Sequence, residues 1–145
     1  GRSTTNYRSG TPILPNIVAF HTALKLALEE QSKHHLYVLE LQTYLLDYLK
    51  KKKDIVINNT SRSSVYFVNF SVLKMNANDL VSLLEEKGII VSAKTSCCPL
   101  NTSSKLVYAL TKNKKVASSS IRVSLSYLTT KGELDKLIEA LESVI

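Results

Sequence analysis

The first third of the chain repeats its apolar residues with the spacing of an α-helix. Two amphipathic stretches follow this period; the apolar positions are Ile17, Phe20, Leu24, Ala27 and Leu28 in the first and Val38, Leu41, Leu45, Tyr48 and Leu49 in the second. Four consecutive lysines at residues 50–53 follow the second stretch, where cations complement the partial negative charge of a helix C-terminus. The pattern therefore predicts two helices within residues 14–50.

Three later segments have patterns typical of β-strands. Residues 65–72 are rich in β-branched and aromatic side chains, which favour strands. Residues 89–92 begin with Ile-Ile-Val, and residues 121–125 alternate apolar and polar side chains. Residues 58–61 read Asn-Asn-Thr-Ser and predict a turn or loop. We expect the three strands to form one small sheet.

Two more helices are predicted, near residues 76–87 and 131–145, each with a start signal. Asn76 is a good N-cap with Asp79 in the first turn, and Gly88 suits the left-handed turn after a helix. Thr130 and Glu133 have the spacing of a capping box. The mixture predicts an α+β fold in which helices cover a small three-stranded sheet.

The length of 145 residues fits one domain with a real core. No apolar run approaches the roughly 18 residues of a membrane span. From its composition we expect the N-terminal stretch to be neither a signal peptide nor a transit peptide. The chain begins at Gly1 and enters a polar stretch, which we interpret as a cut through a longer protein. Two cysteines make no disulfide framework, so we expect reduced thiols in a cytoplasmic protein.

The formal net charge of +7 raises the question of an anionic partner. Part of the charge is the lysine run at residues 50–53, and a second cluster is Lys112, Lys114 and Lys115. Neither cluster is interleaved with aromatic residues or accompanied by a nucleic-acid motif. A solvated surface is the main interpretation of these lysines and a functional basic patch the alternative.

Three features could carry chemistry. The only cysteines, Cys97 and Cys98, are adjacent in a polar segment that reads as a loop; they are either small buried hydrophobes or reactive thiols near lysines. Arg122 lies between Ile121 and Val123. Its side chain either faces solvent or forms a structural ion pair, or it binds an anionic substrate through two parallel hydrogen bonds. Zinc is disfavoured, because the histidines His21, His34 and His35 lack ligand spacing.

The third feature is the sequence Arg-Ser-Gly-Thr-Pro at residues 8–12, before the first predicted helix. It is either a Gly-Pro turn in which Thr11 caps the helix, or an anion site at a helix N-terminus.

The order of these segments resembles the C-terminal part of cysteine desulfurases, pyridoxal-phosphate enzymes of the class V aminotransferase family. The resemblance spans residues 7–145, and its most specific stretches are "KGIIVSAKTSC" at 87–97 and "SSIRVSLSYLTT" at 119–130. It implies the small C-terminal domain of a fold-type-I pyridoxal-phosphate enzyme.

The resemblance also implies a role for each candidate residue. Cys97 would be the nucleophile that takes sulfur from L-cysteine as a persulfide and leaves L-alanine. Arg122 would hold the substrate carboxylate, and Thr11 would reach the cofactor phosphate of the other subunit in a homodimer. This chain has Lys94 where the family often has glycine, and a second thiol, Cys98, follows the aligned one.

The implied organisation has three parts: a residual segment of the large-domain cofactor region at 1–13, connecting helices at 14–50, and a small C-terminal domain with the catalytic cysteine loop at 51–145. Pyridoxal phosphate would be bound mainly by a large domain absent from this chain, because no lysine here has the family's cofactor motif, so the chain alone is expected to be inactive. The sulfur would pass to an acceptor protein for iron–sulfur cluster assembly or tRNA thiolation. Alternatives are a selenocysteine lyase or another class V lyase and, from a different class, a basic nucleic-acid-binding module.

Overall fold

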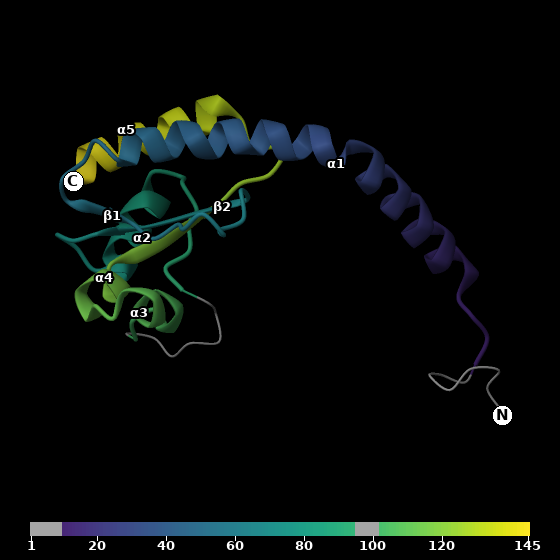
Figure 1. The fold of residues 1–145 in the computed structure, drawn as a ribbon, viewed down its shortest axis with the longest axis horizontal. Helices are drawn as coiled ribbons and strands as arrows, with labels where there is room; N and C mark the ends of the chain where they lie inside the picture. The colour runs from purple at the N-terminus through teal and green to yellow at the C-terminus, as the bar shows by residue number, and fades with distance from the viewer. Residues whose placement is uncertain (1–9, 95–101) are drawn as a thin grey trace. The chain divides into compact units, whose positions relative to one another are not determined.

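The computed structural model describes residues 10–94 and 102–145. The elements in chain order are α1 (Leu14–Leu49), β1 (Ile55–Ile57), β2 (Phe67–Val72), α2 (Ala77–Glu86), α3 (Lys105–Thr111), α4 (Lys114–Ser118), β3 (Ser120–Ser124) and α5 (Lys131–Val144) (Figure 1). The chain separates into two compact units, Gly1–His34 and His35–Ile145, so α1 contributes residues to both. No helix in the described ranges is long and apolar enough to cross a membrane.

Residues 14–49 form one helix of 36 residues, not the two helices predicted from periodicity. The polar stretch between the two apolar patterns, residues 29–35, contains no glycine or proline. Nothing therefore interrupts the backbone hydrogen bonds, because these are the residues that break helices most strongly. The division of the chain at residues 13/14 and 50/51 stays a prediction.

The larger unit is built on a three-stranded antiparallel sheet in the order β1-β2-β3, which confirms the predicted α+β class. Ile55 of β1 lies opposite Val72 of β2, and Val68 of β2 lies opposite Val123 of β3.

One predicted strand is wrong, because residues 89–92 do not form a ladder and the third strand is β1. The chain leaves α2 with Ile89 N–H still donating to the Leu84 carbonyl, 2.9 Å away, and only Ser92 reaches β3. The sequence did not predict β1, because a run of three apolar residues has too few positions to show a period.

One face of the sheet carries the main core. Alternate residues Val68, Phe70 and Val72 of β2 are buried, as the two-residue period of a strand requires. Ile121 and Val123 of β3 join them. The second half of α1 together with α2 and α5 covers this face, as predicted for the last two (Figure 1), and these helices contribute Val38, Leu41, Leu45, Leu49, Ala77, Leu80, Leu84, Leu134, Leu137, Ala140 and Leu141. Full burial of one such aliphatic or aromatic side chain contributes about 1.5–3 kcal/mol.

The other face of the sheet is polar and carries the short helices α3 and α4. Ser71 of β2 is fully buried there, and its hydroxyl donates to the Val116 carbonyl of α4 over 2.8 Å. A small apolar cluster of Val107, Val116 and Ala117 fixes the two helices to each other. These helices were not predicted, because each is only five to seven residues long.

The predicted helix ends are confirmed. The Asn76 side chain accepts a hydrogen bond from Asn78 N–H at the start of α2. Gly88 has φ +74°, the left-handed conformation that favours glycine after a helix. At α5, Thr130 and Glu133 form the reciprocal capping box, with side chain to backbone bonds in both directions.

The start of α5 should make stability depend on pH. Hydrogen bonds from the Thr130 backbone and hydroxyl lower the pKa of Glu133, and the Tyr44 hydroxyl and then Lys131 lower the pKa of Asp135. Because both pKa values lie below those of the unfolded chain, the stabilisation is complete above the unfolded values of 4.5 and 3.8. It is lost as the pH falls through the lowered values of the folded chain.

Thermal unfolding followed from pH 7 into acid tests this dependence. We expect the double variant Glu133→Gln/Asp135→Asn to lose less of its unfolding temperature below about pH 4.5 than the unchanged chain. Equal losses in the two proteins would show that other groups set the acid limit.

Candidate functional site

Arg122 projects from the polar face of the sheet. Its neighbours Ile121 and Val123 point into the core, so the alternation of a strand directs Arg122 to the opposite face. It lies opposite Asn69 of β2. On its other side, Ser92 N–H donates to the Arg122 carbonyl over 3.1 Å, and Arg122 N–H donates to the Ser92 carbonyl over 2.6 Å. The backbone of Arg122 is therefore fixed from both sides.

The Arg122 guanidinium carbon lies 5.4 Å from the centre of the Phe67 ring, a cation–π contact that orients the side chain. Its Nε atom is buried and has no hydrogen-bond partner within the described ranges. None of the ion pairs formed by residues 10–94 and 102–145 includes Arg122. Because an unpaired buried donor costs free energy, this guanidinium is well suited to an anionic ligand.

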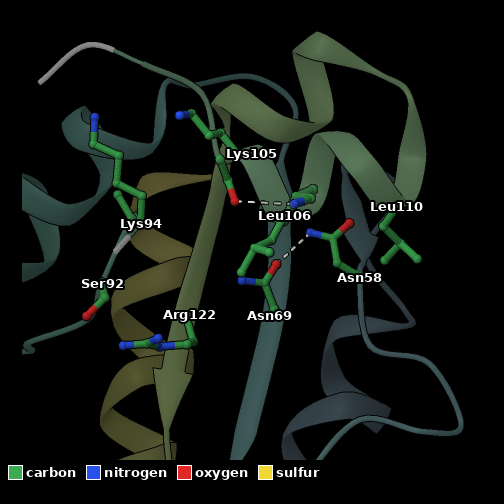
Figure 2. Close-up of a pocket in the computed structure, with 11 residues that line it drawn as sticks. Asn58, Asn69, Ser92, Lys94, Lys105, Leu106, Leu110 and Arg122 are labelled. Atoms are coloured by element: carbon green, nitrogen blue, oxygen red, sulfur yellow. Dashed lines mark hydrogen bonds between the residues drawn. The ribbon is translucent and has the colours of Figure 1, made fainter. Parts of the chain in front are cut away.

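Arg122 lines a pocket of about 250 Å³ beside α3 (Figure 2). Its lining residues are Asn58, Asn69, Ser92, Ala93, Lys94, Ser104, Lys105, Leu106, Val107, Leu110 and Arg122. The lining contains three cationic side chains and no acidic one, and its amides and hydroxyl groups can bind either donors or acceptors. The pocket therefore favours an anion, such as a carboxylate, next to apolar groups.

Asn58 supports the wall of this pocket. Its Nδ2 donates to Asn69 Oδ1 over 2.8 Å and to Ser71 Oγ over 2.9 Å, and Figure 2 shows the first of these bonds. Asn58 is only 7% exposed, and its Oδ1 has no partner within the described ranges. The sequence predicts only a turn or loop at Asn58; an amide directly after the apolar run of residues 55–57 is the signal of a buried polar position there.

Described residues on both sides of the segment 95–101 line this pocket. Lys94 and Ser104 are among its lining residues. The Lys94 ammonium donates to the Thr102 carbonyl over 3.2 Å, and Ser104 N–H donates to the Ala117 carbonyl over 3.0 Å. The described chain therefore stops at Lys94, a lining residue of the pocket, and resumes at Thr102, two residues before the lining residue Ser104.

The predicted site residues differ in how they can be placed. Cys97 and Cys98 lie outside the described residues. Thr11 is exposed and precedes α1, after Gly10 with φ +107°, and it belongs to the smaller unit. Arg122 belongs to the larger unit. Its side chain is neither fully solvated nor part of an ion pair within the described ranges.

Pyridoxal phosphate, the cofactor that the resemblance implies, is held through a lysine amine and an aspartate beside its ring nitrogen. The pocket has Lys94 and Lys105 but no aspartate or glutamate, and Lys94 bonds to Thr102. The lining residues therefore do not fit the complete cofactor. They fit an anionic substituent.

Comparison with known proteins identifies the family. The family model described as aminotransferase class-V matches residues 2–137. The mitochondrial cysteine desulfurase of Arabidopsis thaliana is 32% identical over 133 residues, which cover 91% of this chain and 29% of that protein. Cysteine desulfurase IscS of Pseudoalteromonas translucida is 30% identical over 141 residues, 95% of this chain and 34% of that protein.

Solved structures of NifS-like proteins have a fold similar to that of this chain. The structure of a NifS-like protein from Rickettsia africae matches with a TM-score of 0.75 and 27% sequence identity. The match covers 94% of this chain and 36% of that protein. The structure of another NifS-like protein matches with a TM-score of 0.77 and 25% sequence identity, and the match covers 94% of this chain and 35% of that protein. The chain thus spans about a third of the length of these relatives. With the family model matching most of its residues, the chain belongs to the class V aminotransferase family.

Proposed function

We propose that this chain is the C-terminal part of a cysteine desulfurase that converts L-cysteine to L-alanine and keeps the sulfur as a persulfide on Cys97. The observation that carries the proposal is the Arg122 pocket. The Arg122 Nε atom has no partner within the described ranges, the lining of the pocket has no acidic residue, and Lys94, directly before the cysteine-bearing segment, belongs to the same lining. The relatives named cysteine desulfurase support the same reaction.

Arg122 would bind the α-carboxylate of L-cysteine. A guanidinium offers two parallel hydrogen bonds to a carboxylate, and the Phe67 ring restricts its rotation. Lys94 and Lys105 would add positive potential around the same anion. This arrangement fixes the orientation of the amino acid, and a fixed orientation accelerates a reaction between bound groups.

Cys97 would act as a thiolate on the sulfur atom of the substrate. In this step the substrate Cβ–S bond breaks and a sulfur–sulfur bond to Cys97 forms, so the substrate leaves as alanine once its carbon has taken a proton. The cations at the pocket favour the thiolate form over the thiol. Pyridoxal phosphate would supply the electron-accepting chemistry from a part of the protein outside this chain.

Further assignments extend the proposal to the complete protein. Thr11 would contact the cofactor phosphate of the other subunit of a homodimer. The persulfide sulfur would pass to an acceptor protein for iron–sulfur cluster assembly or tRNA thiolation in the cytoplasm.

Turnover of two substrates by the complete protein tests the proposed reaction. We expect L-cysteine to give alanine and sulfide in equal amounts when a thiol reductant is present. Turnover of L-selenocysteine with no alanine from L-cysteine would replace the desulfurase assignment by a selenocysteine lyase.

The chain alone should not bind pyridoxal phosphate as a cofactor. The Arg122 pocket has no lysine paired with an acidic residue. When the chain is mixed with pyridoxal phosphate, we therefore expect no stoichiometric absorbance at long wavelength, and only slow formation of adducts on surface lysines. A spectrophotometric titration measures this directly. An absorbance change that saturates at one cofactor per chain would contradict the proposal that the cofactor is held by a part of the protein outside this chain.

A further inference from the structure

Asn69 lies directly opposite Arg122 in the sheet, and both line the same pocket. The backbone N–H and carbonyl of Arg122 both bond to Ser92, on the side away from β2. Asn69 and Arg122 are therefore a non-hydrogen-bonded pair, the kind in which the two side chains lie closest. Asn69 is half-buried. Its amide is thus placed to reach an anion that Arg122 binds.

A series of hydrogen bonds fixes which end of the Asn69 amide faces Asn58. The series starts at the Val116 carbonyl, which can only accept, so the single hydroxyl proton of Ser71 is donated to it over 2.8 Å. Towards Asn58, Ser71 Oγ can then only accept, so the atom of Asn58 that lies 2.9 Å from it is the nitrogen Nδ2. The same Nδ2 donates to Asn69 over 2.8 Å, and the atom that receives this bond is Oδ1.

The nitrogen of the Asn69 amide is directed to the pocket as a result. The oxygen and the nitrogen leave the amide carbon in different directions, so an amide whose oxygen meets Asn58 turns its nitrogen away from Asn58. Figure 2 shows this nitrogen on the side of the amide towards Arg122. The backbone of Asn69 is held as well, because its N–H donates to Asn59 Oδ1 over 2.7 Å and its carbonyl accepts from Asn58 N–H over 2.9 Å. The sheet therefore presents amide donors beside the guanidinium, in a lining without acidic residues.

The burial of Asn58 is explained by this orienting contact. Asn58 is 7% exposed, and its Oδ1 is buried without a partner within the described ranges. An unpaired buried acceptor lowers stability, which an apolar residue of similar size would avoid. The Nδ2 group, in contrast, uses both of its protons, one towards Ser71 and one towards Asn69. Asn58 thus contributes through donation, and the donation sets the direction of the Asn69 amide.

We propose that Asn69 is a second ligand of the substrate carboxylate, beside Arg122, and that Asn58 is a positioning residue that turns the donor end of the Asn69 amide towards it. The two oxygens of a carboxylate accept about four hydrogen bonds, and a guanidinium supplies two of them. Asn69 supplies a third. The inference rests on the proposed function, because the carboxylate is that of L-cysteine.

Calorimetric titration of the complete protein, loaded with its cofactor, tests the role of Asn69 with two probes. The first, 3-mercaptopropionate, is L-cysteine without its amino group, and the second, cysteamine, is L-cysteine without its carboxylate. We expect Asn69→Ala to weaken binding of 3-mercaptopropionate about tenfold, the effect of one hydrogen bond to a charged group, and to change binding of cysteamine less than about twofold. Asn69→Asp should weaken binding of 3-mercaptopropionate further, because it keeps the size of the side chain and replaces the donor by a like charge.

Three results of these titrations would overturn the role of Asn69. They are equal weakening of the two probes in Asn69→Ala, unchanged binding of 3-mercaptopropionate in that variant, and failure of the unchanged protein to bind 3-mercaptopropionate. An unfolding temperature measured for each variant shows that the protein remains folded.

Asn58→Leu tests the positioning step. Leucine is similar in size but forms no hydrogen bond, so the Asn69 amide can turn either end to the pocket. Binding of 3-mercaptopropionate should weaken about threefold, as expected if the donor end faces the ligand about a third of the time. The double variant Asn58→Leu/Asn69→Ala should bind this probe as Asn69→Ala does, because Asn58 acts only through Asn69. Losses that add in the double variant would contradict the positioning role.

Arg122→Ala in the same titrations separates this inference from the proposed function. We expect it to weaken binding of 3-mercaptopropionate at least as much as Asn69→Ala does, because it removes two hydrogen bonds and a charge. A loss in Arg122→Ala but not in Asn69→Ala would reject Asn69 as a ligand and keep the carboxylate site at Arg122. No loss in either variant would reject the carboxylate site itself, and the role of Asn69 with it.

Discussion

Replacing Cys97 by alanine should abolish persulfide formation from L-cysteine in the complete protein. Alanine has no sulfur to attack the substrate, so the Cβ–S bond has no acceptor. Alanine production, measured by chromatography, should fall to the background rate. Binding of L-cysteine should be retained, because Arg122 and its pocket are untouched by the change.

The neighbouring thiol is the matched control for this variant. Cys98→Ala removes the same atoms one residue later and should retain most of the activity, because Cys98 has no assigned step. Loss in Cys98→Ala with activity in Cys97→Ala would move the nucleophile by one residue. Full activity in both single variants would exclude sulfur transfer to this segment.

Arg122→Ala should lower kcat/KM for L-cysteine about 10- to 100-fold. The change removes charge-assisted hydrogen bonds to the carboxylate, which are worth about 1.5–3 kcal/mol, and each 1.4 kcal/mol is a factor of ten in rate. Arg122→Lys should recover only part of this loss, because an ammonium cannot form the two parallel bonds of a guanidinium. Steady-state kinetics on both variants measures the effect.

Arg62→Ala is the control for loss of an arginine. Arg62 is exposed in the loop before β2 and does not line the Arg122 pocket, so its replacement should leave kcat/KM unchanged. Comparable losses in the Arg62 and Arg122 variants would indicate a general effect of charge. An unfolding temperature measured for each variant shows whether the protein remains folded.

The sequence was most informative where a pattern was long or a helix end was specific. The β-branched run of β2, the alternation around Arg122 and the capping box of α5 all predicted their structures, because each depends on local backbone preferences. The short elements β1, α3 and α4 depend on contacts with the sheet, such as the bond from Ser71 to Val116, and so left no periodic signal.

The pocket around Arg122 was harder to predict than Arg122 itself. Asn58 and Asn69 meet only because β1 and β2 pair, and Lys94 reaches Thr102 across eight residues of chain. Sequence spacing does not reveal such contacts. The absence of acidic residues between 87 and 132, in contrast, could be read from the sequence directly.

Mapping the bound sulfur by mass spectrometry tests the central claim most directly. The complete protein is incubated with L-cysteine without reductant, its free thiols are alkylated, and the peptides are sequenced. The account predicts the mass of one added sulfur atom on Cys97 in the unchanged protein, and much less of it in Arg122→Ala at low substrate concentration. Added sulfur on Cys98 alone, or on neither cysteine while alanine is produced, would contradict it.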